Sequence, residues 1–325
     1  MRVEQLDMEE WWRGDKRRFA EAFGSALDAE RGSGFAVITG HRIPMSVITE
    51  SYTAARRVLT LPEEKLRKYE NIAGHHETGY SPFGLEYSEF NKNVGDLKHL
   101  WNVRRTLGPN NPRLLSPHYI PNVWPTEVPE FKESCDNMFF YLDMVSGELL
   151  LALEMYLDIE PGTLLLMTRD GETLMRAIHY PAIKGKTPAL RSWPHTDINL
   201  ITLLVAAVTW SKDGPINFDS GDSGLEVQDT QGRWLSVNET PGSIVVNSAD
   251  MLEEYCRGYN LRPMHSTMHR VKNPNAGEES DLERGSWPFF VHPKGETILD
   301  PATGLTAGQF LLQRLRDIGV VADNS

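Results

Sequence analysis

Three side chains in this sequence have the types and the spacing of a metal site. His195 and Asp197 stand two positions apart at the opening of the longest strand candidate, and His269 follows far downstream next to another likely strand. On an extended chain, residues i and i+2 point to the same side, so an imidazole and a carboxylate can reach one ion. Two histidines and one carboxylate leave open positions on the metal, an arrangement that suits oxygen-activating iron(II). The three residues therefore predict a non-haem iron site.

The second histidine of this set has a competitor. His265 precedes His269 by four positions, and the spacing alone does not choose between the two. A lone histidine is more often a hydrogen-bonded structural residue than a metal ligand. We expect that structural role for four others: His41, His75, His118 and His292.

Arg284 and Ser286 carry the groups that bind a carboxylate. Arginine presents a planar fork that matches a carboxylate, and a nearby hydroxyl adds one donor. If neighbouring strands carry His269 and Arg284 side by side, this pair can hold the far carboxylate of a dicarboxylic co-substrate whose near end binds the metal. An isolated arginine of this kind would more often form a surface salt bridge, so the prediction depends on its place after the metal ligands.

The elements that must position these residues change in character along the chain. Helices are expected at about residues 15–30 and 45–59, and a glycine-bounded apolar run predicts a strand at 34–39. Apolar residues recurring every three or four positions predict a long helix within 129–159. After residue 174, short β-rich runs are separated by turn residues; they cover 198–208, 225–227, 234–237, 244–246 and 289–291. We expect a mainly β fold with flanking helices: a double-stranded β-helix (jelly-roll, cupin-like) core with an N-terminal helical buttress.

The chain is expected to form a single catalytic unit over residues 1–325. Residues 1–160 would form a mixed α/β and helical support region, residues 161–300 the jelly-roll core with the metal site, and residues 301–325 a C-terminal helix and tail. The stretch Ser211–Ser223 is long and rich in glycine, aspartate and serine. It is either a lid over the substrate or an ordinary solvent loop.

Composition excludes several classes of function. The formal net charge of −12 gives a surface that repels phosphate backbones, so we expect no nucleic-acid partner. Two cysteines, Cys135 and Cys256, are too few for a disulfide framework or a zinc–thiolate site. Neither a signal peptide nor an apolar run long enough to span a membrane is evident. We expect a cytoplasmic protein with a small-molecule substrate, as a monomer or a homo-oligomer.

The ordered motifs resemble the isopenicillin N synthase-like group of iron(II)/2-oxoglutarate-dependent dioxygenases. The resemblance covers most of the chain. The main matching motifs, in order, are Gly79-Tyr80-Ser81-Pro82, Asp96-Leu97-Lys98-His99, His195-Thr196-Asp197, Pro241-Gly242-Ser243, Ser266-Thr267-Met268-His269-Arg270-Val271 and Arg284-Gly285-Ser286-Trp287-Pro288. It implies that His269, which stands directly before Arg-Val, is the metal ligand rather than His265. It also implies that Arg284 and Ser286 bind 2-oxoglutarate, assisted by Tyr180.

The resemblance implies an enzyme that uses iron(II), O2 and 2-oxoglutarate to hydroxylate, desaturate or cyclise a small molecule, with release of succinate and CO2. The alternative is an oxidase of the isopenicillin N synthase kind, which uses O2 without 2-oxoglutarate. Arg284 and Ser286 leave that alternative open, because such oxidases can use the pair to hold a substrate carboxylate.

Two further features depart from the family pattern, one at a single position and one in a loop. Many relatives have an asparagine two residues before the tyrosine, where this chain has Ile178, and residues 275–280 look like an inserted loop. The primary substrate is not evident. Five aromatic residues are candidates for the mouth of the barrel: Tyr80, Phe83, Trp101, Trp193 and Phe289.

Overall fold

The computed structural model describes residues 2–73, 76–85, 94–115, 119–183, 190–219, 224–229, 231–274 and 281–317. Its helices are α1 (Glu9–Arg13), α2 (Lys16–Leu27), α3 (Met45–Leu59), α4 (Glu63–Leu66), α5 (Glu130–Leu157), α6 (Thr163–Thr168), α7 (Asp250–Gly258) and α8 (Ala307–Asp317), with 3-10 turns at Arg67–Tyr69 and Pro112–Leu115. Helices α2, α3 and α5 confirm the three helices expected from the sequence. Their apolar faces repeat at the helical period, so each helix buries one side.

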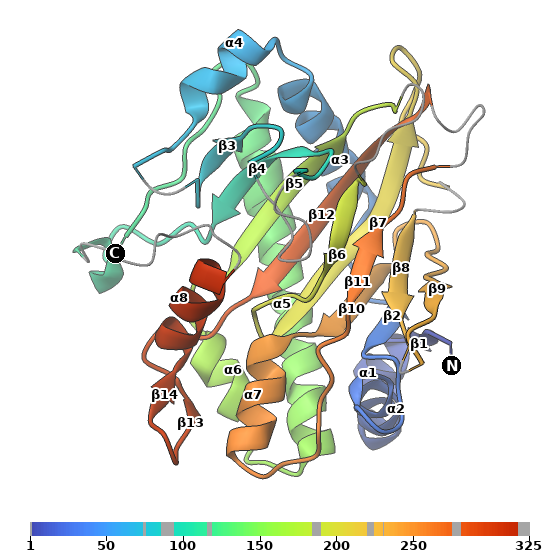
Figure 1. Ribbon diagram of the computed structural model, residues 1–325, viewed down its shortest axis with the longest axis vertical. Coiled ribbons are helices and arrows are strands. Elements are labelled where there is room, and N and C mark those ends of the chain that lie inside the picture. The colour runs from blue at the N-terminus through green and yellow to red at the C-terminus, as the bar shows by residue number, and fades with distance from the viewer. Residues whose placement is uncertain are drawn as a thin grey trace.

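The strands of the described chain form two large sheets and one small hairpin (Figure 1). The larger sheet has the order β1 (Glu4–Asp7), β2 (Phe35–Thr39), β10 (Ile244–Ser248), β7 (Ile201–Trp210), β12 (Glu283–Val291), β5 (Leu174–Tyr180), β4 (His99–Arg104) and β3 (Gly79–Ser81). The smaller sheet has the order β6 (Ser192–His195), β11 (His269–Val271), β8 (Leu225–Gln228) and β9 (Trp234–Ser236). The hairpin pairs β13 (Ile298–Asp300) with β14 (Leu305–Thr306).

The two sheets face one another and pack through a dedicated hydrophobic cluster. Its buried members from the larger sheet are Phe35, Val37 and Val245, and those from the smaller sheet are Leu225, Val227 and Val271. This packing confirms the expected jelly-roll core, in which two antiparallel sheets share one interior.

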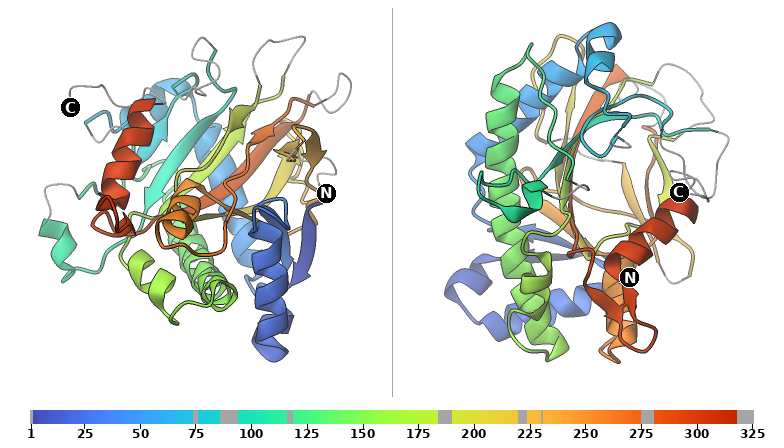
Figure 2. Two further views of the ribbon diagram at one scale, coloured as in Figure 1. Left: turned by 60° about the horizontal axis from the view of Figure 1, so that its bottom comes forward. Right: turned by 90° about the vertical axis from the view of Figure 1, so that its left-hand side faces the viewer.

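Helices α3 and α5 cover the outer face of the larger sheet (Figures 1 and 2). Alternation along β5 shows how one strand serves both faces. Met175 and Ala177 join the main hydrophobic core beneath the helices, whereas Ile178 and Tyr180 join a small cluster with Leu100 on the inner face. The period of two in a strand explains this division and leaves the inner face available for polar side chains.

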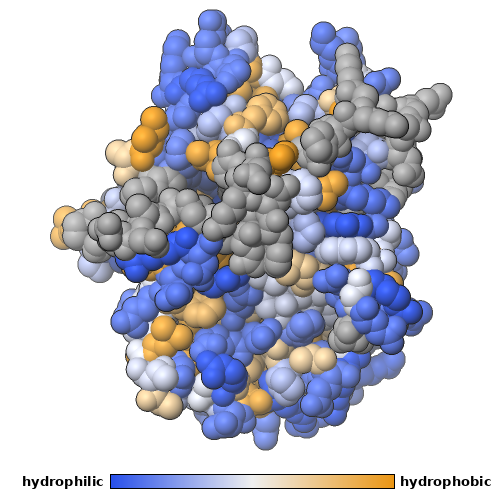
Figure 3. Space-filling model, viewed as in Figure 1, coloured by the Kyte–Doolittle hydropathy of each residue, from blue (hydrophilic) through white to orange (hydrophobic). Residues whose placement is uncertain are grey.

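The N-terminal part of the chain also contributes directly to the larger sheet, because β1, β2, β3 and β4 are four of its strands. Hydrophilic side chains dominate the face of the molecule shown in Figure 3, and the hydrophobic ones are spread over it in small groups. Among the helices of the described residues, none has the length and the apolar character required to cross a bilayer.

Candidate active site

His195 and His269 are direct partners in the smaller sheet. They pair in the antiparallel register of β6 and β11, and their ring centroids are 4.3 Å apart. The Nδ1 of His195 lies 2.7 Å from the carbonyl oxygen of Trp193, and that of His269 lies 3.0 Å from the carbonyl oxygen of Thr267. A carbonyl only accepts, so each Nδ1 must carry the proton and donate it. Both Nε2 lone pairs are therefore free to bind a cation.

Asp197 lies just beyond β6, and its carboxylate is held from one side. Its Oδ2 accepts hydrogen bonds from Thr202 Oγ1 at 2.6 Å and from Asn247 Nδ2 at 2.9 Å. Its Oδ1 is 3.8 Å from His269 Nε2. Burial raises the pKa of Asp197, but His269, His195 and the two hydrogen-bond donors together outweigh burial, so this pKa lies below its ordinary value. The carboxylate therefore stays ionised and presents one oxygen to the histidines.

One ligand atom from each of His195, Asp197 and His269 lies within 4.8 Å of the other two. No other group of three such side chains converges in this way within the described part of the chain. The donor set of two imidazoles and one carboxylate fits iron(II) and differs from the thiolate-rich sets of structural zinc. His265 is not in the group; its side chain is 36% exposed and lies 3.9 Å from Glu253.

Two details of the expected strand arrangement are wrong. The segment carrying His195 does not open the long strand β7: β6 belongs to the smaller sheet, and the chain crosses to the larger sheet before Ile201. His269 and Arg284 are likewise not on neighbouring strands, because β11 lies in the smaller sheet and β12 in the larger one. Hydrophobic periodicity indicates that a segment is a strand, but it does not reveal which of two sheets the strand joins.

Arg284, Ser286 and Tyr180 come together on the inner face of the larger sheet. Arg284 pairs with Tyr180, and Ser286 pairs with Ile178, in the antiparallel register of β12 and β5. The Arg284 guanidinium carbon is 4.9 Å from the centre of the Tyr180 ring. All three side chains are buried. At the position where relatives have asparagine, Ile178 packs against Leu100 and Tyr180, so an apolar contact replaces a polar one.

A chain of polar side chains lies on the opposite face of the same strands. Glu283 Oε2 is 2.7 Å from His179 Nε2, and it also accepts a hydrogen bond from Trp210 Nε1 at 2.9 Å. His179 Nδ1 is 2.7 Å from His99 Nε2, and His99 Nδ1 is 3.1 Å from the hydroxyl of Tyr80. The hydrogen bond from His179 holds the pKa of Glu283 below its ordinary value. The network ties β4, β5, β12 and β7 together at the level of Arg284.

Gly285 lies between Arg284 and Ser286 in β12 and faces the helix-covered side of the sheet. A Cβ atom there would lie 2.9 Å from the ring of Trp210 and 3.3 Å from that of Tyr52. The Trp210 ring in turn stacks on His179, with centroids 5.4 Å apart. A residue larger than glycine would push this packed layer away from the strand that carries Arg284 and Ser286.

Three of the aromatic residues expected at the barrel mouth lie elsewhere. Tyr80, Trp101 and Phe289 are buried in the core beneath the helices, so that expectation is wrong for them. Strand alternation instead directs Phe290 to the same face as Arg284, and the Arg176 guanidinium lies 5.1 Å from its ring centre.

The two remaining candidates for the mouth are only partly enclosed. The ring of Phe83 stacks on His99 with centroids 4.2 Å apart, and Phe83 is 47% exposed. Trp193 precedes His195 on β6 and is half-buried.

The described part of the stretch Ser211–Ser223 packs on the helix-covered side of the larger sheet. Arg56 from α3 donates to the carbonyl oxygens of Gly214 at 2.7 Å and Lys212 at 2.9 Å. The ring of Phe218 meets that of Tyr52 edge to face. Nothing in these contacts covers the inner face; residues 220–223 lie outside the described residues, as do His75, His118 and the loop 275–280.

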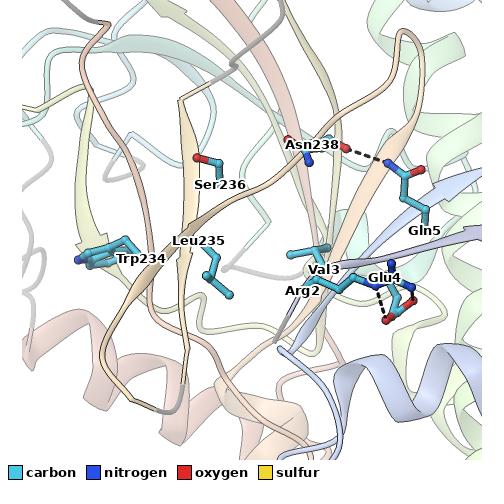
Figure 4. A pocket seen from close by; sticks show the side chains of 8 residues that line it. All are labelled: Arg2, Val3, Glu4, Gln5, Trp234, Leu235, Ser236 and Asn238. Atoms are coloured by element: carbon cyan, nitrogen blue, oxygen red, sulfur yellow. Dashed lines mark hydrogen bonds and ion pairs between the residues drawn. The ribbon is translucent and has the colours of Figure 1, made fainter.

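A recess of about 480 Å³ opens at the edges of the two sheets, between β1 and β9 (Figure 4). Its lining residues are Arg2, Val3, Glu4, Gln5, Trp234, Leu235, Ser236 and Asn238. Gln5 Nε2 donates to the carbonyl oxygen of Asn238 at 3.2 Å and so joins the two edges. None of the six predicted site residues lines this recess.

Comparisons with known proteins cover most of the chain and identify its family. Residues 3–127 match the family model described as the non-haem dioxygenase in morphine synthesis N-terminal, and residues 171–293 match the 2OG-Fe(II) oxygenase superfamily. The 2-oxoglutarate-Fe(II) type oxidoreductase hxnY of Emericella nidulans is 30% identical over 295 residues, which cover 88% of this chain and 78% of that protein. The chain belongs to the 2OG-Fe(II) oxygenase superfamily. The oxygenase uses iron(II), 2-oxoglutarate and O2.

Other relatives agree with this assignment. The validamycin A dioxygenase of Streptomyces hygroscopicus is 24% identical to this oxygenase, with 93% of this chain and 80% of that protein covered. The crystal structure of a 2OG-Fe(II) oxygenase family protein from Caulobacter crescentus has a TM-score of 0.79 and 31% identity, with 97% and 99% covered. A full-length Neurospora crassa protein, solved in complex with alpha-KG, has a TM-score of 0.78 at 22% identity, with 97% and 96% covered, and so shares the fold.

The roles of three residues near this site were not predicted from the sequence. Thr202 and Asn247 hold Asp197, and Arg191 is buried near the start of β6. For Thr202 a signal was present, because it is one of only two polar residues, with Thr209, in an apolar strand. Arg191 gave a weaker signal, since a single arginine before a strand usually lies on the surface.

Proposed function

We propose that His195, Asp197 and His269 hold the iron(II) of this oxygenase. The observation that supports this most directly is the pairing of His195 with His269 across β6 and β11, with Asp197 Oδ1 facing His269 Nε2 at 3.8 Å. Hydrogen bonds from Nδ1 fix both imidazoles, and Thr202 fixes the carboxylate. These contacts would orient the three ligands for the metal, and a set of three protein ligands would leave the remaining coordination positions open.

Arg284, Ser286 and Tyr180 form the proposed clamp, the set of residues that binds the far carboxylate of 2-oxoglutarate. The guanidinium and the hydroxyl lie on one face of β12, two residues apart, and supply several donors to one carboxylate. Burial strengthens these interactions, since little water competes for the charge. With iron bound, O2 would be the oxidant: two of its four oxidising equivalents would convert 2-oxoglutarate to succinate and CO2, and the other two would oxidise the substrate.

The substrate is proposed to be a small molecule that is hydroxylated, desaturated or cyclised. Its proposed position is the inner face at the end of β12 that pairs with Thr202, near Phe290 and Arg176, where an aromatic ring and a guanidinium lie together. The protein's task there is to orient one bond of the substrate towards the metal and to exclude water. We further infer that residues 1–325 act as one catalytic unit, because β1 to β4 are strands of the same sheet as β12.

Oxygen uptake by the iron-loaded protein, measured with and without 2-oxoglutarate and paired with a succinate assay, tests this function. A pool of small metabolites should increase both oxygen uptake and succinate release in parallel. The oxidase alternative predicts oxygen uptake that is equal without 2-oxoglutarate and forms no succinate. That result would overturn the clamp assigned to Arg284 and Ser286.

A further inference from the structure

Arg191 is a buried arginine held between the two sheets. It is 5% exposed and lies just before β6. Its backbone N–H donates to Asn273 Oδ1 at 3.0 Å, on the side of the smaller sheet. Its Nη2 donates to the carbonyl oxygen of Leu282 at 3.0 Å, two residues before Arg284 on the side of the larger sheet. The guanidinium is therefore anchored beside the strand that carries the proposed clamp.

The charge of Arg191 has no counterion among the described residues. No described carboxylate lies within ion-pair distance of it, and its buried Nε has no hydrogen-bond partner. Burial, followed by the positive charge of Arg284, lowers the pKa of Arg191 to about 10, while Tyr180 acts in the opposite direction. A buried cation without a paired anion is costly, so the site favours a ligand that brings negative charge.

We propose that Arg191 is a second binding residue for the far carboxylate of 2-oxoglutarate, acting together with Arg284. The inference rests on the proposed function, because the metal must hold the near end of the co-substrate. A carboxylate has lone pairs for several donors, so it can accept from both guanidinium groups. The pair would select a dicarboxylic over a monocarboxylic oxo acid, since only the former places an anion between two buried cations.

The test compares two ligands on the same protein. The iron(II)-loaded protein is titrated without oxygen by calorimetry, once with 2-oxoglutarate and once with 2-oxobutanoate, which lacks the far carboxylate. In Arg191→Met, the Kd for 2-oxoglutarate should rise by about 10- to 100-fold, as for loss of a charge-assisted contact. The Kd for 2-oxobutanoate should change by less than about threefold. Arg191→Lys should lie between, because it keeps the charge and loses the fork.

Arg105→Met is the matched control. It also removes one positive charge, but Arg105 is only partly buried and pairs with Asp143 of helix α5 through two contacts of 2.7 Å. Binding of both acids should be unchanged in this variant. The ratio of the two Kd values is taken within each sample, so it remains informative if a variant is less stable.

The outcomes separate the two proposals. If the parent protein does not bind 2-oxoglutarate, or if Arg284→Met binds it equally well, the proposed clamp is wrong. If the clamp behaves as expected but Arg191→Met weakens both acids equally, or neither of them, the role of Arg191 is overturned while the clamp stands.

Discussion

His195 and His269 face each other as register partners on adjacent antiparallel strands, with ring centroids 4.3 Å apart. Backbone carbonyls two residues earlier in the chain, those of Trp193 and Thr267, accept hydrogen bonds from the Nδ1 atoms of both rings. The distance between the two proposed ligands is therefore set by the hydrogen-bond ladder of a sheet and not by a loop. Sites built on regular elements are more precise than sites on loops, because the backbone fixes the positions of the side chains.

Replacing the proposed ligands tests the choice between neighbouring histidines. His269→Ala should abolish iron(II) binding and turnover, because only Asp197 and His195 would remain. His265→Ala should retain most of both, since its exposed side chain lies near Glu253 and not at the site. Iron content after reconstitution and oxygen uptake measure the two effects. An equal loss in both variants would show that the ligand role is assigned incorrectly.

Thr202 should affect the metal through Asp197. Thr202→Val keeps the shape of the side chain and removes the 2.6 Å hydrogen bond to Oδ2. The affinity for iron(II) should fall by about tenfold or more, as for other groups that orient a metal ligand. Thr202→Ser, which keeps the hydroxyl, should restore most of it. Competition with a coloured chelator measures the affinity; unchanged affinity in Thr202→Val would count against this positioning role.

Glu283 should affect binding of 2-oxoglutarate without touching it. Glu283→Ala removes the acceptor shared by His179 and Trp210 behind the strand that carries Arg284. The KM for 2-oxoglutarate should rise several-fold while iron affinity stays the same. Glu226→Ala is the matched control, because its carboxylate binds Arg270 in the smaller sheet at 2.8 Å. A parallel loss of iron affinity would indicate general disruption instead.

His99 should make the fold sensitive to acid. Burial and the neighbouring His179 lower the pKa of His99 to about 3, so the folded protein holds it neutral. The unfolded chain binds the proton near the ordinary value of about 6.5, so stability is full above that pH and falls as the pH drops towards 3. Between about pH 6.5 and pH 5 this group alone should cost about 2 kcal/mol.

Urea unfolding of the metal-free protein at about pH 7 and about pH 5 measures that loss. His99→Phe should be less stable at the higher pH, because it loses its contacts with Tyr80 and His179, but its stability should depend less on pH. A pH dependence identical to that of the parent protein would exclude His99 as the source.

Much of the architecture follows from local patterns. The apolar stripe of α5, the glycine-bounded β2 and the short runs that became β8, β9 and β10 are properties of period and turn residues, which act over a few positions. The predicted metal and clamp residues were likewise found by residue type and order. The structure groups each set as expected: His195, Asp197 and His269 at one place, and Arg284, Ser286 and Tyr180 at another.

The sequence by itself predicted which residues could bind iron and a dicarboxylate, because side-chain types and the order of motifs are read directly from it. Only the tertiary structure decided which face each residue occupies. One-residue alternation in β12 sends Phe289 to the helices and Phe290 inward, and the crossing between β11 and β12 puts His269 and Arg284 on opposite sheets. The proposed role of Arg191 could be recognised only in the tertiary structure, because it depends on groups far away in the chain. These are a carbonyl near β12, the charge of Arg284 and burial between two sheets.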